Sequence, residues 1–220
     1  MGGRTIVAMT TFARRQWPVP AGLLLLAAVP VLAGGIRVAE LGGGADVTAA
    51  NARFFADPVP VVLHIVGATV FCVLGAFQFA PSLRGRRWHR LAGRAVLPCG
   101  LIAAVSGLYM TLFYPLPPSD GPLLGGFRIV VGTLMVVALV LAFQAIRRGD
   151  VPTHRAWMLR AYAVGIGAGT QAVVSAVWYL AVGAPDVTTR AWLLGAAWAI
   201  NLTVAEWSVR RREKRLPVTA

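Results

Sequence analysis

Six long apolar runs constrain this chain more than any other feature of its sequence. Each run has about the length, near 20 residues, that an α-helix needs to cross the hydrocarbon core of a bilayer. The runs cover residues 19–36, 59–81, 92–114, 123–146, 157–182 and 191–209. Because an unpaired backbone amide is costly in lipid, runs of this kind fold as helices. The sequence therefore predicts an all-α fold, a polytopic transmembrane bundle of about six helices.

The composition favours a bilayer rather than water as the solvent of these helices. Hydrophobic residues make up 57% of the 220 residues and charged residues only 13%. Soluble domains are roughly half apolar and about a quarter charged, and a chain of this length could not hide the excess in a water-soluble core. We expect a single transmembrane domain over residues 1–220.

The basic residues predict how the bundle is oriented. Lys and Arg are enriched in the cytoplasmic connections of membrane proteins, and all but four of the 21 basic residues fall at one end of the six runs. They lie in the N-terminal tail, after the second run, after the fourth run and in the C-terminal tail. The four exceptions are Arg37, Arg53, Arg128 and Arg190. We therefore expect both termini on the cytoplasmic side of the inner membrane.

The net charge of +13 needs no nucleic-acid partner. A nucleic-acid-binding protein carries its basic residues as an exposed stripe among polar ones, whereas here they flank apolar runs. The expected partners are the bilayer and the anionic lipids of its cytoplasmic leaflet. The first run follows Arg14 and Arg15, as the core of a cleaved signal peptide would. We expect a retained helix instead, because no small-residue cleavage site precedes a polar stretch.

Two predicted helix hairpins resemble each other. The second run ends with Ala76-Phe-Gln78 and the fourth with Ala142-Phe-Gln144, and a basic turn follows each. His89-Arg then precedes the third run, and His154-Arg precedes the fifth. A duplication would make the hairpins a parallel repeat about an axis along the membrane normal. Chance similarity between sequences rich in Ala, Leu and Arg is the alternative.

The repeat places His89 and His154 at matching depths near the cytoplasmic ends of two helices. Two imidazoles at one depth suit the axial coordination of a b-type haem. One hypothesis is therefore a haem-binding redox protein with these two ligands and an unidentified electron-transfer partner. The alternative is that both histidines, like Trp88 and Trp157, anchor helix ends at the membrane interface. Neither histidine has a carboxylate or thiolate beside it, so we expect no metal-ion site.

A second hypothesis concerns the outer end of the bundle. His64 and Arg128 lie at similar depths in the second and fourth runs, and polar residues within membrane helices are often functional. They could line an outer pocket of a transporter or another small-molecule-binding bundle, although Arg128 could instead extend its side chain to the interface. An accessory subunit without chemistry of its own is a third interpretation.

Motifs of common enzymes are missing from the sequence. The chain has no phosphate-binding loop, no nucleophile elbow and no His-Glu-x-x-His, so neither a hydrolase nor a nucleotide-driven pump is supported. We assign no catalytic residue.

Several segments resemble a known family. They are Phe77-Gln-Phe79, Arg87-Trp-His-Arg-Leu-Ala-Gly-Arg94, Gly126-Phe-Arg-Ile129 and Ile146-Arg-Arg-Gly-Asp-Val-Pro-Thr-His-Arg-Ala-Trp-Met-Leu-Arg-Ala-Tyr162. Over roughly residues 60–180 the chain resembles the bacterial membrane family catalogued as domain of unknown function 2306. The resemblance implies a multi-pass membrane protein and implies no particular activity. It also implies an arginine midway along the fifth run, where this chain has Gln171.

Overall fold

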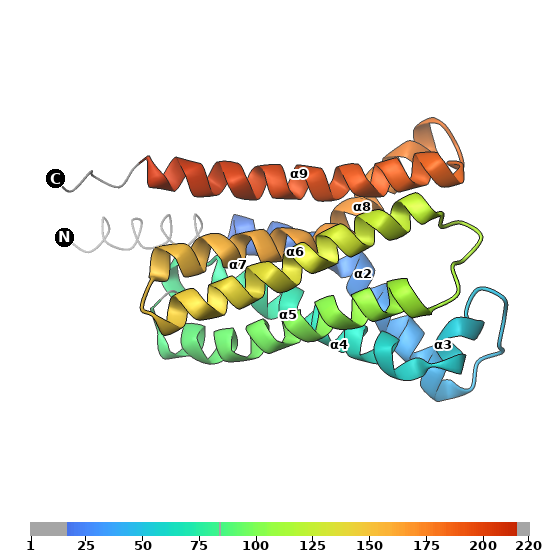
Figure 1. Cartoon of the computed structure of the whole chain (residues 1–220), viewed down its shortest axis with the longest axis horizontal. Coiled ribbons are helices and arrows are strands. Elements are labelled where there is room, and N and C mark those ends of the chain that lie inside the picture. The colour runs from blue at the N-terminus through green and yellow to red at the C-terminus, as the bar shows by residue number, and fades with distance from the viewer. Residues whose placement is uncertain (1–16, 84, 215–220) are drawn as a thin grey trace, which may run out of the picture.

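The computed structural model describes residues 17–83 and 85–214 (Figure 1). The helices are α2 (Pro18–Gly43), α3 (Ala52–Ala56), α4 (Pro58–Gln78), the short 3-10 helix η1 (Pro81–Leu83), α5 (Arg87–Phe113), α6 (Pro122–Arg147), α7 (Val151–Gly165), α8 (Gly167–Ala181) and α9 (Val187–Glu213). This part of the chain contains no strand, which confirms the predicted all-α class.

Four helices, α2, α4, α5 and α6, are long and apolar enough to cross a membrane. Together α7 and α8 also meet this condition, as two halves bent by 41°. The helix α9 has 27 residues but is not among these candidates, because polar Asn201 and Glu206 interrupt its apolar sequence. Among the described residues the structure thus supports four or five candidate spans, where the sequence predicted about six.

Proline begins several of these helices. Pro18, Pro58 and Pro122 each occupy the first turn of a helix, where the fixed φ of proline suits the helix and its missing N–H is not needed. Two others begin at a carboxylate cap. Asp150 accepts a hydrogen bond from the backbone of Thr153 at the start of α7, and Asp186 caps α9 in the same way. The boundaries of the helices therefore follow from local sequence.

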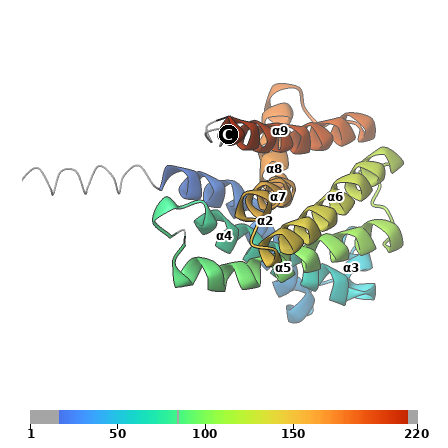
Figure 2. The same ribbon diagram turned by 60° about the vertical axis from the view of Figure 1, so that its left-hand side comes forward.

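Two antiparallel hairpins, α4 with α5 and α6 with α7, form the centre of the bundle. The helix α2 packs against α4 and α8, while α9 lies along α7 and α8 at the edge (Figures 1 and 2). The connections between α4 and α5 and between α6 and α7 lie at one end, which we call the basic end (Figure 1). The opposite end holds α3 and the connections at residues 114–121 and 182–186, and we call it the α3 end.

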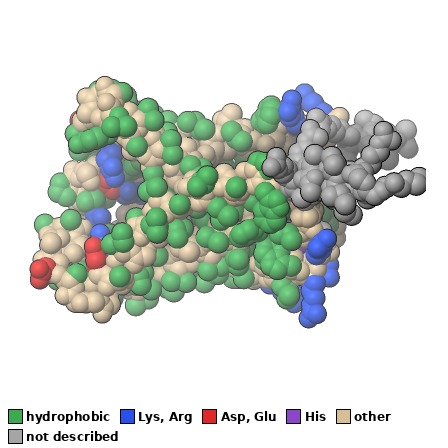
Figure 3. Space-filling view, turned by 180° about the vertical axis from the view of Figure 1, so that it is seen from behind, with side chains coloured by type: hydrophobic (Ala, Val, Ile, Leu, Met, Phe, Trp, Pro, Cys, Tyr) green, Lys and Arg blue, Asp and Glu red, His purple; other side chains and the backbone are tan. Residues whose placement is uncertain are grey.

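The surface chemistry follows the same division. Figure 3 shows apolar side chains across the middle of one face, basic side chains at the basic end, and both charge signs around a hollow at the α3 end. Large apolar side chains such as Leu25, Val130 and Leu180 are exposed on the outer faces of the helices, as a lipid-facing surface requires. Five of the basic residues used to predict the orientation lie outside the described residues. They are Arg4, Arg14, Arg15, Arg84 and Arg215.

The core at mid-bundle is built around Phe71, which is fully buried. Glycines on two other helices make room for its ring, since a Cβ on Gly100 or Gly165 would lie 2.6 Å from a ring carbon of Phe71. Small residues that let helices approach closely are typical of membrane bundles.

The fifth predicted run is two helices rather than one. The helices α7 and α8 meet at Ile166, between Gly165 and Gly167. An added side chain at Gly167 would collide with the indole of Trp198 from α9. Just before the break, the Tyr162 hydroxyl of α7 donates to the backbone carbonyl of Cys72 on α4 at 2.9 Å. The bend therefore allows α7 and α8 to pack against α4 and α9, and it corrects the continuous helix expected over 157–182.

Candidate functional site

A cavity of about 420 Å³ extends from the α3 end into the middle of the bundle. All the helices from α2 to α9 except the short η1 contribute to its wall. The wall is largely apolar. Its polar or charged members are Arg53, His64, Thr69, Thr111, Tyr114, Asp120, Arg128 and Gln171. A mainly apolar cavity of this size with a few polar groups is typical of small-molecule sites.

Asp120 is the centre of a charged cluster at the mouth of this cavity. Its Oδ2 lies 2.7 Å from Nη1 of Arg128, and its Oδ1 accepts a hydrogen bond from Nε of Arg190 at 3.1 Å. The Asp120 side chain is only 5% exposed. Burial by itself raises the pKa of this carboxyl, but the two guanidinium groups outweigh burial and hold the pKa below its ordinary value of 3.8. Asp120 is therefore a carboxylate at neutral pH.

Arg128 combines the two roles that the sequence left open. It lies inside α6 and lines the cavity, and its guanidinium also extends to Asp120 in the connection that precedes the helix. Its side chain is 33% exposed, so the ion pair is only partly withdrawn from solvent. A ligand entering the cavity would therefore meet an arginine whose orientation is already fixed.

His64 faces the same cavity from α4. Its Nδ1 lies 2.8 Å from the backbone carbonyl oxygen of Ala103 on α5. Because a carbonyl oxygen only accepts hydrogen bonds, Nδ1 carries the proton, and Nε2 of the neutral ring is an acceptor. Gly107 leaves room for the ring, since a Cβ there would lie 3.1 Å from Cε1. The structure thus brings His64 and Arg128, the two residues of the outer-pocket hypothesis, to one cavity.

Arg53 is a cavity residue that the sequence did not single out. It lies on α3, and its guanidinium stacks over the ring of Phe54 at 4.6 Å from the centroid. No carboxylate forms an ion pair with Arg53 within the described ranges. The available signal was its place among the four basic residues at the outer end, a set used only to orient the bundle.

The other two histidines lie elsewhere. His89 and His154 are in the first turns of α5 and α7 at the basic end, and neither lines the cavity. Nδ1 of His154 lies 2.9 Å from the carbonyl oxygen of Ala142 on the preceding helix. The helices α5 and α7 make little contact, because each packs mainly on its own hairpin partner. Among the described residues, no group of three or more His, Cys, Asp or Glu is placed to hold a metal ion.

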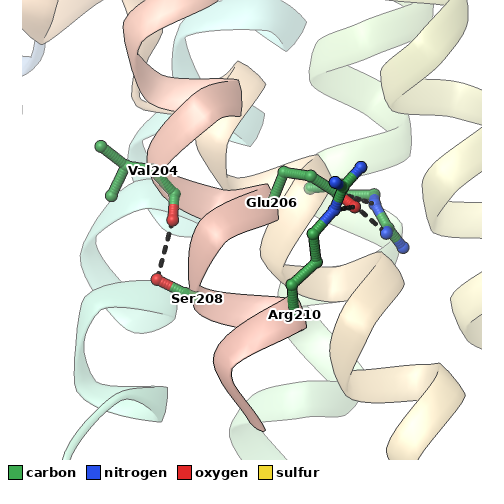
Figure 4. Close-up of polar contacts among 5 residues, drawn as sticks. Val204, Glu206, Ser208 and Arg210 are labelled. Atoms are coloured by element: carbon green, nitrogen blue, oxygen red, sulfur yellow. Dashed lines mark hydrogen bonds and ion pairs between the residues drawn. The ribbon is translucent and has the colours of Figure 1, made fainter. Parts of the chain in front are cut away.

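Arg160, a charged residue within the fifth predicted run, forms an ion pair with Glu206 of α9. The Glu206 carboxylate accepts hydrogen bonds from Nε and Nη2 of Arg160, at 3.0 and 2.8 Å, and from Nε of Arg210 at 3.1 Å. Figure 4 shows the side chains of Glu206 and Arg210 turned toward each other on α9. Glu206 thus holds one arginine of its own helix and one arginine of α7. This cluster stabilises the packing of α9 on α7.

Polar contacts also connect α9 with the broken helix. Oγ1 of Thr170 donates to Oδ1 of Asn201 at 2.9 Å, and Nδ2 of Asn201 donates to the carbonyl of Ala163 at 3.1 Å. Gln171, at the position where an arginine was expected, lines the cavity and donates to the carbonyl of Leu194 at 3.3 Å. Asn201 and Gln171 therefore have structural partners inside the bundle.

The family of this chain follows from its sequence match. No curated protein sequence and no solved structure matches the chain. The family described as "Predicted membrane protein (DUF2306)" matches residues 61–209, which is more than half of the chain and runs from α4 into α9. The match confirms the resemblance seen in the sequence and extends it past residue 180. The chain belongs to this DUF2306 family of predicted membrane proteins.

Proposed function

We propose that this chain is a membrane-embedded binding protein that takes an amphiphilic anion into the cavity at the α3 end. One observation carries the proposal: the cavity has apolar walls and an excess of positive charge at its mouth. Arg53 and Arg128 line it together with a single carboxylate, Asp120, and Asp120 is also paired with Arg190 outside the cavity. An anionic head group would complement this charge.

The deeper walls suit the apolar part of such a ligand. Phe71, Met135 and Trp198 contribute to them, and burying an alkyl chain against such side chains supplies most of the free energy of binding. Nε2 of His64 carries no proton in this tautomer and cannot donate to a carboxylate, so Arg53 and Arg128 are the groups that would hold the head group. The start of α8, at Ile166 and Ala168, also borders the cavity, and interrupted helices border ligand sites in several transporter folds.

The proposal is tested by equilibrium binding. Sodium decanoate is titrated against the protein in nanodiscs of zwitterionic lipid, with empty nanodiscs as the blank. The variant Arg128→Gln should weaken binding about tenfold or more, as expected when a hydrogen bond to a charged group is lost. Arg53→Gln should weaken it as well, with membrane insertion unchanged.

A matched control is available on the same helix. Arg147 lies at the basic end of α6, stacks on Phe143 at 5.8 Å and does not line the cavity. Arg147→Gln removes the same charge and should leave binding of decanoate unchanged. Unchanged binding in both Arg128→Gln and Arg53→Gln, or equal losses in all three variants, would contradict the proposed site.

We further propose a membrane arrangement of six passes with both termini in the cytoplasm of the cell, in its inner membrane. In this arrangement α7 and α8 form one broken span and α9 forms the sixth. The low hydropathy of α9 is compatible with a span, because Asn201 and Glu206 form hydrogen bonds to α7 and α8 rather than facing lipid. Basic residues at the basic end would then contact anionic lipid of the inner leaflet.

Haem binding by His89 and His154 is a second candidate function. The hydrogen bond from Nδ1 of His154 to Ala142 favours it, since it leaves Nε2 as the lone-pair nitrogen, the usual arrangement of a ligating histidine. A reduced-minus-oxidised spectrum of protein made with ample haem should show a b-type band that His154→Ala removes. A colourless protein would leave both histidines as interfacial anchors.

A further inference from the structure

We infer that the cavity prefers an amphiphile whose head group carries two negative charges, a phosphate monoester, over one with a singly charged carboxylate or sulfate. This inference rests on the proposed function and specifies the head group of the ligand at the same site. Three observations support it: the balance of charge at the mouth, the surroundings of Arg53, and the placement of two guanidinium groups on separate helices.

Three arginines and one carboxylate are grouped at the mouth of the cavity. Asp120 lies between Arg128 and Arg190, at ion-pair distances of 2.7 and 3.1 Å. Arg53 lines the cavity from α3, and among the described residues Asp120 is the only acidic residue of the lining. Arg190 is outside the lining but contacts the same carboxylate as Arg128. Three positive charges against one negative charge leave an excess of two.

Other acidic residues of the α3 end do not remove this excess. Glu40 forms an ion pair with Arg37 at 2.5 Å, and the carboxylate of Asp186 caps the start of α9. Neither of these carboxylates lines the cavity, and neither do Asp46 and Asp57. They act on the mouth mainly through solvent, which screens exposed charges. The excess at the mouth is therefore left for a ligand to balance.

The surroundings of Arg53 show the same imbalance. Burial is the largest cause that lowers the pKa of its guanidinium below the ordinary value. The carboxylate of Asp120 raises this pKa, whereas the positive charges of Arg128 and Arg37 lower it further. The result is a lowered pKa, so Asp120 does not compensate Arg53 for its burial and its like-charged neighbours. A second anion at the mouth would supply that compensation.

The placement of the guanidinium groups suits a tetrahedral head group. Arg53 comes from α3 and Arg128 from α6. Arg53 lays its face over the ring of Phe54, and stacking of this kind leaves the N–H groups at the edge of a guanidinium available. A phosphate monoester has three strong acceptor oxygens, so two guanidinium groups from different helices can bind it together. A carboxylate offers only two oxygens in one plane.

Three ligands with tails of similar length test the inference. Decyl phosphate, decyl sulfate and decanoate are titrated at pH 8 against the protein in zwitterionic nanodiscs, with empty nanodiscs as the blank. The second pKa of a phosphate monoester is about 6, so only decyl phosphate carries two charges. It should bind at least tenfold more tightly than the other two, as expected for an added hydrogen bond to a charged group.

The possible failures are distinguishable. Equal or weaker binding of decyl phosphate would overturn the inference and leave the proposed function standing. Binding of none of the three ligands above the blank would overturn the proposed function itself. Inorganic phosphate, which has no tail, should not displace decyl phosphate at equal concentration. Equal displacement would show that the site takes free phosphate and would contradict an amphiphilic ligand.

The charge of the ligand can also be changed on one molecule. Between pH 5 and pH 8 decyl phosphate gains its second charge, whereas decyl sulfate keeps a single charge. The affinity for decyl phosphate relative to decyl sulfate should rise about tenfold over this interval. Titration of a protein group such as His64 would change the binding of both ligands. A constant ratio would contradict the preference for a doubly charged head group.

Variants of the arginines test the balance of charge. Arg53→Gln should lower the ratio of decyl phosphate to decyl sulfate affinity about tenfold. Arg190→Gln should lower it a few fold, because this partly exposed arginine acts from outside the lining. Arg147→Gln, at the basic end of α6 and outside the cavity, is the matched control and should leave the ratio unchanged. An unchanged ratio in both Arg53→Gln and Arg190→Gln, or an equal reduction in Arg147→Gln, would overturn the inference.

Discussion

Arg128, Asp120 and His64 illustrate at the residue scale how polar groups are accommodated within an apolar bundle. An isolated charge or an unpaired polar group in hydrocarbon is expensive. Here the guanidinium reaches a carboxylate, and the imidazole reaches a backbone carbonyl. Each contact fixes one polar group on the wall of the cavity. A ligand would therefore meet groups that are already oriented, which lowers the entropic cost of association.

Replacing Asp120 should destabilise the α3 end. The variant Asp120→Asn removes the ion pairs with Arg128 and Arg190, and the free energy of unfolding should fall by about 1–3 kcal/mol, as for a buried charged group that loses its partner. The partial exposure of both arginines keeps the loss within this range. Unfolding in detergent followed by tryptophan fluorescence measures it. Asp46→Asn, at an exposed position, is the control and should change little.

The ion pairs of Asp120 with Arg128 and Arg190 also predict that stability depends on pH. The pKa of Asp120 in the folded protein lies below its ordinary value of 3.8, so its ion pairs stabilise the fold above that pH. Their contribution is lost as the pH falls through the lower, folded-state pKa. The difference in melting temperature between the natural chain and Asp120→Asn should therefore narrow between pH 6 and pH 3. A difference that stays constant over this interval would show that the carboxylate is not the stabilising group.

The sequence located some of the candidate site and missed the rest for a physical reason. His64 and Arg128 were recognised because polar residues inside apolar runs are conspicuous. Arg53 lies on α3 and Asp120 in a connection, where charged residues are common and do not by themselves indicate a pocket. Their convergence on Arg128 and His64 depends on how the connections fold over the bundle, which local sequence does not determine.

At the scale of the elements, the glycines of α8 decide how closely its neighbours approach. A Cβ on Gly169 would collide with the backbone carbonyl of Leu26 on α2, and one on Gly167 would collide with Trp198 on α9. Backbone atoms cannot move aside as the end of a flexible side chain can. The packing of α2 on α8 therefore requires glycine at residue 169.

Gly169→Ala should disrupt this contact. Because α2 has to move away from α8, we expect a loss of about 1–3 kcal/mol in the free energy of unfolding, the usual effect of overpacking. Gly93→Ala on α5 is the matched control, since nothing lies within 4 Å of an added Cβ there and alanine favours the helix. Denaturation in detergent measures both variants. Equal stability of Gly169→Ala and Gly93→Ala would show that α2 does not pack closely at this position.

The break between α7 and α8 could not be predicted from the local sequence. Five of the six apolar runs correspond to single helices, because hydropathy and proline positions set their lengths. The run over 157–182 does not, since Gly165 and Gly167 also suit a continuous membrane helix. Only the ring of Phe71 and the indole of Trp198, which fill the spaces beside these glycines, make the bent form favourable. The helix α3 escaped prediction because five residues are too short for a periodic signal.

For the whole molecule, the proposed orientation leads to a labelling prediction. In a variant without its natural cysteines, Cys72 and Cys99, a new cysteine is placed at Ser119 or Arg148, which are exposed in connections at opposite ends. Ser119→Cys should react with an impermeant maleimide in intact cells. Arg148→Cys should react only after the membrane is opened. The reverse pattern would invert the bundle and place the mouth of the cavity in the cytoplasm.

The central claim is that an anionic amphiphile occupies the cavity, and photolabelling tests it most directly. A decanoate analogue with a diazirine near its tail end is irradiated with the protein in nanodiscs, and mass spectrometry locates the label. The account predicts label on residues of the deep wall, such as Thr69, Ala104 and Met135, and a loss of that label when excess decanoate competes. Label confined to the lipid-facing surface, at residues such as Leu25, Val130 and Leu180, would contradict it.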